Sequence, residues 1–510
     1  MSTRHRFALN VIMNWIAMAV AMVVPFFLTP LVVKHLGATA YGIWILAIST
    51  VGYLNLLDLG LRSAIIRFVS KAQTQGRVDE AQDAISAALW FRSLISSAVV
   101  VISIILTFVF VRWFKIPPDM KWAAQITILM CSLGVANTLV SGVFGAVLAA
   151  MSRYDILSLI TVSQTVLRAL GVIFILRSNR GLISIALWDF TVGLLTGLAT
   201  WLITRKLYPI SRVKIQKPNM QTFKMLWSYS FTMFIIIISA QVVFSTDNLV
   251  IGSFLSVGLV SFYSIGGSLT VYSRQIVSAM STTFTPMASS LEAAGRMDDL
   301  QKLLMRGTQA SLGLALPISL ALLFRGKTFI GLWMGQQYAT VSGTVLQILM
   351  ISQFFTVANV TAANIMFATG KHKAVAKCAS IEALLNFCLS VFLVRKIGIY
   401  GVAWGTSITM LLVHLSFWPA YVQRALNVPA WKYIWSGWGK ITASSIPFGI
   451  ACALADRHWH ASSLLIYFSQ ILITLPIYVI AVALVFHKES KALVMKWYNR
   501  KAELKLAPDA

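Results

Sequence analysis

Long apolar runs recur along the whole chain and are separated by short polar segments. Each run has about 20 residues or more, the length that an α-helix needs to cross a hydrocarbon core about 30 Å thick. Because the runs are continuous and do not alternate, they predict helices and not the strands of a membrane barrel. We expect about fourteen spans, at residues 8–33, 41–69, 85–111, 122–150, 155–176, 182–204, 225–252, 257–288, 302–324, 342–369, 374–394, 401–423, 438–456 and 463–486.

The segments that follow some of these spans resemble one another. The chain reads Gly76-Arg77-Val78-Asp79-Glu80 after the second span and Gly295-Arg296-Met297-Asp298-Asp299 after the eighth, 219 residues later. Similar pairs occur at nearly the same offset after the fourth and tenth spans (149–153 and 368–371) and before the sixth and twelfth (181–186 and 398–403). Matches in the same order at equivalent places predict that a unit of six spans is duplicated.

This duplication predicts the domain organisation. The expected parts are an N-terminal lobe (1–204), a basic cytoplasmic linker (205–224), a C-terminal lobe (225–424), two further spans (438–486) and a basic tail (487–510). Because each copy holds an even number of spans, both lobes enter the membrane from the same side. A pseudo-two-fold axis along the membrane normal should then relate them. The predicted fold class is an all-α polytopic membrane protein.

Composition and charge agree with this class. The chain is 58% hydrophobic and only 11% charged, whereas a soluble domain carries about 25% charged residues. The net charge of +26 is explained by basic cytoplasmic loops and by anionic lipid headgroups. More than twice as many Lys and Arg residues fall in loops on the side of the N-terminus, which places both termini in the cytoplasm. No basic soluble domain is visible, so nucleic acid is not an expected partner.

The sequence shows no sign of an enzyme, a cofactor or a metal centre. Gly326-Lys327-Thr328 lacks the upstream glycine and the strand of a phosphate-binding loop. The short cluster Asp456, His458 and His460 fits a hydrated loop better than a metal site. The cysteines fall in predicted spans without metal-ligand spacing and are interpreted as small core residues: Cys131, Cys378, Cys388 and Cys452.

Charged residues inside spans are the best indication of function, because each costs about 3 kcal/mol at the membrane centre unless it is paired or hydrated. Two readings stay open for them: a hydrated cavity between the lobes, or structural pairs such as Asp58 with Arg62, four residues apart. The candidate cavity residues are Arg274, Arg168, Arg62, Arg92, Asn55, Gln241 and Asn14. Asp58 and Asp247 are candidates for coupling transport to an ion.

The first seventy residues resemble a known family. They contain Asn14, the run Pro25-Phe26-Phe27-Leu28-Thr29-Pro30, the turn Leu36-Gly37-Ala38-Thr39-Ala40-Tyr41-Gly42-Ile43-Trp44, and Leu57-Asp58-Leu59-Gly60-Leu61. This pattern is similar to that of the polysaccharide transporter family, the bacterial flippases of O-antigen and other lipid-linked oligosaccharides. Their superfamily also contains multidrug and toxin extruders and lipid II flippases.

The resemblance implies two six-helix lobes around a central cavity that opens alternately to either side of the bacterial inner membrane. It implies a polyprenyl-diphosphate-linked glycan as cargo, with membrane lipids and other polysaccharide assembly proteins as further partners. Arginine forks suit the diphosphate of such a cargo, because they bind phosphate oxygens in two places. A multidrug or metabolite exporter of the same superfamily, and less favourably a membrane-embedded glycosyltransferase, remain as alternatives.

Overall fold

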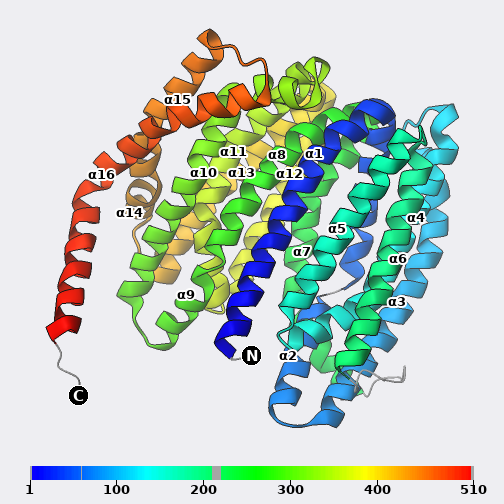
Figure 1. Ribbon diagram of the computed structural model, residues 1–510, viewed down its shortest axis with the longest axis horizontal. Coiled ribbons are helices and arrows are strands. Elements are labelled where there is room, and N and C mark those ends of the chain that lie inside the picture. Colours follow the sequence, from blue (N-terminus) through cyan, green and yellow to red (C-terminus); the bar gives the residue numbers. More distant parts are fainter. Residues whose placement is uncertain (1–2, 59, 209–219, 507–510) are drawn as a thin grey trace. The chain divides into compact units, whose positions relative to one another are not determined.

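The structure is a computed structural model that describes residues 3–58, 60–208 and 220–506, with side chains for 9–58, 60–208 and 234–485. The described residues form helices joined by short turns and contain no strand (Figure 1). The all-α architecture predicted from the sequence is therefore confirmed.

The helices follow one another in a simple order. They are α1 (Thr3–Gly52), the 3₁₀ turn η1 (Leu54–Asp58), α2 (Leu61–Thr74), α3 (Val78–Trp113), η2 (Pro118–Met120), α4 (Lys121–Ala150), α5 (Tyr154–Arg177), α6 (Leu182–Leu207), α7 (Met220–Phe254), α8 (Val257–Ser281), α9 (Phe284–Ala293), α10 (Met297–Met334), α11 (Gln336–Ala368), α12 (His372–Ile397), α13 (Ile399–Leu426), α14 (Ala430–Lys432), the π-helical η4 (Tyr433–Gly439), α15 (Lys440–His458) and α16 (Leu464–Leu506).

Eleven stretches of the described residues are long and apolar enough to cross a membrane. One of them, Leu9–Thr74, contains two of the predicted spans, so the eleven stretches cover twelve predictions. The two missing spans form the helices α8 and α15, which are not among the eleven. The chain is thus a multi-pass membrane protein, and the number of about fourteen spans stays a prediction.

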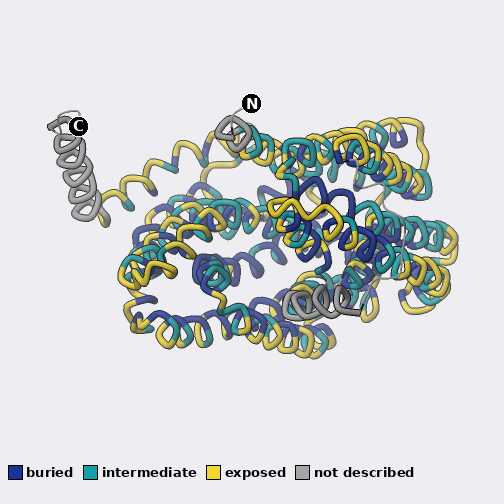
Figure 2. Tube along the Cα trace, turned by 90° about the horizontal axis from the view of Figure 1, so that it is seen from below, coloured by how far each residue is buried: buried dark blue, intermediate teal, exposed yellow. Residues whose placement is uncertain are grey.

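The last helix shows how these helices distribute polarity. The buried side of α16 carries Tyr467, Gln470, Thr474 and Tyr478, spaced three or four residues apart, whereas Leu465, Leu472 and Leu484 are largely exposed (Figure 2). Polar residues toward the protein and leucines toward the surroundings are the reverse of a water-soluble helix. Such a helix is stable where lipid and not water surrounds it.

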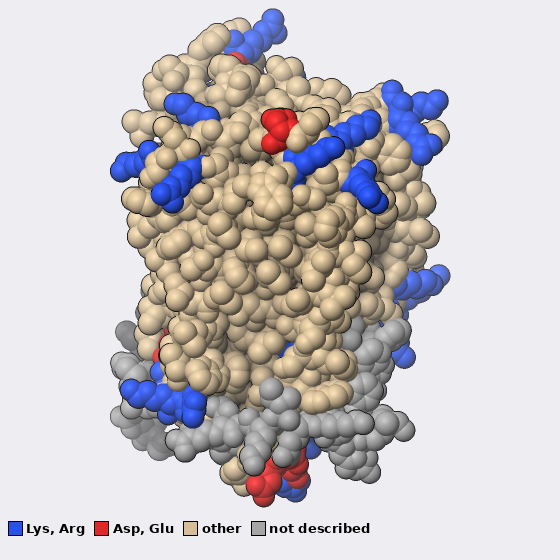
Figure 3. All heavy atoms as spheres, turned by 90° about the vertical axis from the view of Figure 1, so that its right-hand side faces the viewer, with Lys and Arg blue, Asp and Glu red and all other residues tan. Residues whose placement is uncertain are grey.

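Charged residues on the face that includes α3 and α4 show the same adaptation. Lys and Arg gather near the two ends of the helices and leave a wide uncharged belt between them (Figure 3). The ends correspond to the α2–α3 turn on one side and to the segments that join α3 to α4 and α5 to α6 on the other. An uncharged belt bordered by cations is the surface expected of a membrane-spanning bundle.

Close contacts divide the chain into two compact units. The first unit contains residues 1–265 and 376–405, and the second contains 266–375 and 406–510. In the first unit α3 packs along α4, α4 along α6, and α1 along α5. In the second unit α10 packs along α11, and α15 contacts both α10 and α16. The predicted lobes 1–204 and 225–424 follow chain order and stay a prediction.

The turns that suggested a duplication have the same backbone structure. Gly76 and Gly295 both adopt left-handed conformations, with φ of 68° and 65°. The next residue donates its N–H five positions back in both copies, from Arg77 to Ala72 and from Arg296 to Leu291. The turns before α5 and α12 also correspond, since Ser152 and Gly370 have φ of 56° and 69°. The sequence repeat is therefore a repeat of local structure.

The predicted boundaries need two corrections. The second span, 41–69, is not one helix, because α1 ends at Gly52, η1 follows, and Gly60 turns into the left-handed region before α2 begins. The ninth span, predicted to end at residue 324, is followed by a kink at Arg325, and helical residues continue beyond the kink to Met334. Of the predicted linker 205–224, residues 209–219 lie outside the described residues. Within the predicted tail 487–510, α16 continues as helix to Leu506.

Candidate functional site

A buried ion pair holds the broken second span in the first unit. Arg92 of α3 is 2% exposed, and its Nη2 donates to Oδ1 of Asp58 at the end of η1. Its Nη1 donates to the carbonyl oxygen of Leu139 in α4 at 3.0 Å. A side chain at Gly142 would come within 2.7 Å of that nitrogen. Arg92 is therefore enclosed by protein and neutralised, which makes it a structural cation.

Asp58 and Arg62, four residues later, do not form the predicted side-chain pair on one helix, although Asp58 accepts a hydrogen bond from the backbone N–H of Arg62. Such a pair needs one continuous helix, and the chain turns at Gly60 between the two residues. Asp58 pairs with Arg92 instead. The Arg62 side chain is exposed on the first turn of α2, and the described part of the chain offers it no ion pair within 4 Å. Asn55 is exposed on the same broken segment.

A second ion pair lies farther along the first unit and is more accessible. Nε of Arg168 in α5 lies 2.6 Å from Oδ1 of Asp189 in α6, with side chains 43% and 28% exposed. The guanidinium also lies 5.9 Å from the centre of the Trp44 ring of α1. Both helices are apolar membrane spans, and a half-exposed charge at that depth needs water around it. Arg168 and Asp189 thus compensate one another, and the arginine side chain remains partly accessible.

Asp247 of α7 is buried among hydroxyl groups. The Tyr263 hydroxyl of α8 donates to its Oδ2 at 2.5 Å, and Ser390 of α12 donates to its Oδ1 at 3.3 Å. On one side of it in the chain, Thr246 bonds to the hydroxyl of Tyr53 at 2.5 Å, and on the other Asn248 donates to Ser49 at 3.0 Å. Sequence reasoning found Asp247 but missed these partners, because they come from three other helices.

The remaining predicted residues do not gather in one place. Gln241 donates to Ser245 at 2.8 Å within α7 and packs against Gly52. Asn14 is exposed on α1, near the start of its apolar run. Arg274 is partly buried in α8 and belongs to the second unit. The first unit thus combines Asn55, Asp58, Arg62 and Arg92 at one break and Arg168 at the α5–α6 pair.

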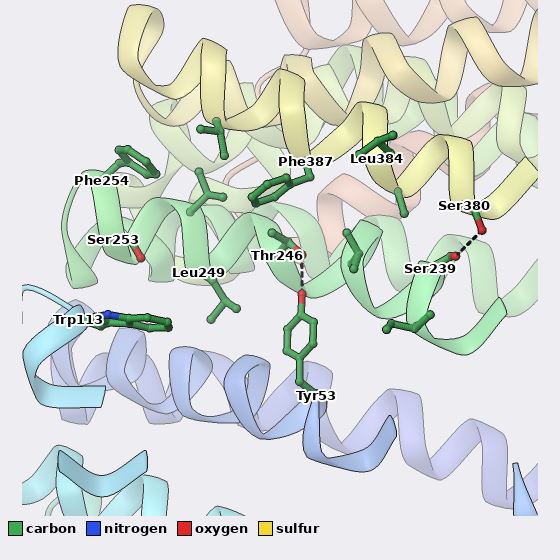
Figure 4. Close-up of a pocket in the computed structure, with 15 residues that line it drawn as sticks. Tyr53, Trp113, Ser239, Thr246, Leu249, Ser253, Phe254, Ser380, Leu384 and Phe387 are labelled. Atoms are coloured by element: carbon green, nitrogen blue, oxygen red, sulfur yellow. Dashed lines mark hydrogen bonds between the residues drawn. The ribbon is translucent and has the colours of Figure 1, made fainter. Parts of the chain in front are cut away.

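The first unit also contains an apolar pocket of about 760 Å³. Residues of α7 and α12 form most of its lining, including Leu249, Leu384 and Phe387, and Tyr53 and Trp113 face them from the opposite side (Figure 4). Four of its polar side chains are bonded in pairs, Tyr53 to Thr246 and Ser239 to Ser380 at 3.4 Å. Ser253 and Trp113 are the other residues of the lining with a polar side-chain group. Such a lining suits a hydrocarbon chain and not a sugar or a phosphate.

Comparison with known proteins places these features in a family. The sequence profile of the family described as "Polysaccharide biosynthesis protein" matches residues 7–292, and the MatE profile matches residues 231–392. The membrane protein EpsK of Bacillus subtilis (strain 168) is 23% identical over 97% of this chain and 98% of its own length. A Shigella flexneri protein, whose name marks it as a candidate O-antigen transporter, is 23% identical over 74% of this chain and 89% of its own.

Solved structures show the same fold. Lipid II flippase MurJ in an inward closed conformation superposes with a TM-score of 0.74 at 16% identity, over 94% of this chain and 99% of MurJ. An inward-facing multidrug resistance transporter of the MATE family gives 0.69 at 13% identity, over 82% and 98% of the two chains. Since the first profile covers more than half of the sequence, the chain belongs to the polysaccharide biosynthesis protein family.

Proposed function

We propose that the protein is a flippase that moves a polyprenyl-diphosphate-linked oligosaccharide from the cytoplasmic to the outer leaflet of the bacterial inner membrane by alternating access. The O-antigen or exopolysaccharide repeat unit is the substrate class that the family and the named relatives support. The basic loops that place both termini in the cytoplasm support the direction of insertion. The observation that carries the proposal is the half-exposed Arg168 within a membrane-spanning helix.

The geometry of Arg168 suits a diphosphate. Asp189 contacts Nε, and we propose that the two terminal nitrogens of the 43% exposed Arg168 side chain are turned toward the substrate. Those nitrogens form the fork that binds two phosphate oxygens at once. Asp189 then acts as a positioning residue that fixes the direction of the fork, while the exposed Arg62 offers a second cation. Arg274, Asn55, Gln241 and Asn14 stay proposed substrate contacts, each at its own place in the chain.

Binding of the lipid tail and coupling to an ion, the other two parts of the proposed transport cycle, also have candidate sites in the first unit. The apolar pocket between α7 and α12 is proposed to receive part of the isoprenoid tail, while the head crosses through water. Asp247, surrounded by hydroxyl oxygens, is the better of the two coupling candidates. The charge of Asp58 is already compensated by Arg92, which makes uptake of a proton or a cation there less favourable.

The test is translocation of a fluorescent lipid-linked oligosaccharide by the purified chain in liposomes. Arg168→Gln should lower the initial rate about tenfold to a hundredfold at limiting substrate, because hydrogen bonds to a charged group are lost. Asp189→Asn keeps the cation and should lower the rate less. Arg180→Gln, in the exposed turn between α5 and α6, is the matched control and should transport at the wild-type rate. An unchanged rate for Arg168→Gln removes this residue from the site.

A second candidate function is an ion-coupled multidrug or metabolite exporter. The MatE profile match over residues 231–392 favours it. Exporters of cations need acids in the cavity, however, and the accessible charge described above includes the arginines Arg62 and Arg168. Resistance of expressing cells to cationic dyes, without any translocation of lipid-linked oligosaccharide in liposomes, would favour the exporter over the flippase.

A further inference from the structure

Helix α5 has two exposed faces of opposite character. One carries Leu159, Val166, Leu170 and Phe174, with the single hydroxyl of Ser163 among them. The other carries Thr161, Gln164, Thr165 and Arg168, which are three or four residues apart and therefore share one side of the helix. The first face is apolar and suits contact with lipid. The second face is polar and does not suit such contact, and it is named the polar face of α5 below.

The hydrogen bonds of the polar face leave it open to a ligand. Thr161 donates to the Leu157 carbonyl at 2.9 Å and Thr165 to the Thr161 carbonyl at 2.8 Å. Both hydroxyls have thus used their proton and present acceptor lone pairs outward. The exposed Gln164 amide makes no hydrogen bond to the described residues, so its donors and its acceptor are all available.

An exposed amide at this depth excludes contact with lipid. Moving an unbonded amide from water into hydrocarbon costs about 4 kcal/mol or more, and α5 is an apolar membrane span. Two turns beyond Gln164 the same side of the helix is closed, because Val172 and Ile175 are buried. The polar face is therefore a bounded hydrated strip, about 10 Å long from residue 161 to residue 168, that ends at Arg168.

We propose that the polar face of α5 is the sugar-binding surface of the transporter. Thr161 and Thr165 accept hydrogen bonds from sugar hydroxyls, Gln164 both donates and accepts, and Arg168 binds the diphosphate that joins the glycan to its lipid. Neutral donors and acceptors beside one cation match the order of groups in a glycosyl diphosphate. A cationic drug would gain nothing from acceptor hydroxyls next to an arginine. This inference rests on the proposed flippase function and adds which residues contact the glycan.

The first experiment asks whether the polar face is wet and whether glycan covers it. In a chain whose four native cysteines are replaced by alanine, Gln164→Cys should react with a membrane-impermeant thiol reagent, and Ser163→Cys, on the opposite face, should not. Lipid-linked oligosaccharide should slow the labelling of Gln164→Cys several-fold, and the same lipid with one sugar should protect less. Failure of Gln164→Cys to react, or equal protection by both lipids, overturns the sugar-binding surface.

The second experiment measures transport in liposomes. The triple variant Thr161→Val, Gln164→Leu, Thr165→Val should move the full lipid-linked oligosaccharide at least about tenfold more slowly, while the rate for the single-sugar lipid changes little. Ser163→Val should behave as wild type with both. Equal losses with both lipids would refute selective sugar contact. Absence of transport by the wild-type chain would instead refute the flippase function, and the labelling would still report whether the face is wet.

Discussion

The first unit contains two arginine–aspartate pairs that differ in how far the arginine is exposed. Arg92 is buried and donates to both a carboxylate and a carbonyl oxygen, so it fastens η1 to α3 and α4. Arg168 is 43% exposed and contacts its aspartate through Nε. Exposure, and not residue type, separates the structural cation from the proposed substrate contact.

The structural role of Arg92 predicts a loss of stability. Arg92→Met should lower the free energy of unfolding by about 2 kcal/mol, because the hydrogen bonds of a buried guanidinium to Asp58 and to the Leu139 carbonyl are lost. Thermal unfolding in detergent measures this loss. Adding Asp58→Asn to Arg92→Met should restore part of the stability. A single variant as stable as wild type would show that the pair does not hold the break.

Sequence reasoning found the charged residues and not their partners. Arg92, Arg168, Asp58 and Asp247 were visible as polar residues in apolar runs. Their contacts join helices that are far apart in the chain, such as Arg168 with Asp189. The one pair deduced from spacing, Asp58 with Arg62, failed because a left-handed Gly60 interrupts the helix. Local spacing cannot predict a contact that depends on tertiary packing.

At the scale of elements, hydrophobic runs located the helices well and their ends poorly. The predicted ninth span, 302–324, leaves Arg325 outside the membrane helix. In the structure it is 1% exposed inside α10, donates to Gln470 of α16 at 2.5 Å, and lies 4.8 Å from the centre of the Tyr467 ring. The charge is tolerated because Asp456 of α15 lies 3.6 Å from its Nε and Gln470 of α16 accepts a hydrogen bond from it. These partners come from helices far along the chain, and spacing along the sequence does not predict them.

This cluster predicts that Arg325 attaches the last two helices to α10. Arg325→Met should lower the midpoint of thermal unfolding by several degrees, since a buried partner of Gln470 is lost. It should also increase proteolysis in the segment before α15. Arg306→Met, at an exposed position of the same helix, is the control and should change neither. Unaltered unfolding and proteolysis of Arg325→Met would contradict the attachment.

The repeated turns predict a cost for side chains at their glycines. Gly76→Ala and Gly295→Ala should each destabilise the chain by about 1 kcal/mol, because φ near +65° brings Cβ against the following carbonyl. Asn at either position should cost less. Gly134→Ala, inside α4 with open space around it, should be neutral or stabilising. Denaturation in detergent compares the five variants, and tolerance of alanine at both turns would show that their conformation is not required.

At the scale of the whole molecule, the two predicted copies share the backbone structure of their turns but not their ion pairs within the helices. At the offsets of the matching segments, Asp58 and Arg92 correspond to Val277 and Ser311, and Arg168 and Asp189 correspond to Asn386 and Thr406. The residues of the second copy that correspond to these ion pairs are thus neutral. The pairs Arg92–Asp58 and Arg168–Asp189 therefore have no charged equivalents at the corresponding positions.

The central claim is that arginines in a hydrated part of the membrane bind the diphosphate of a lipid-linked glycan. The most direct measurement compares two substrates in liposomes that contain the wild-type chain: an oligosaccharide on polyprenyl diphosphate, and the same oligosaccharide on a neutral polyprenol. The account predicts rapid translocation of the first and at least about tenfold slower translocation of the second. Equal rates for the two would contradict it.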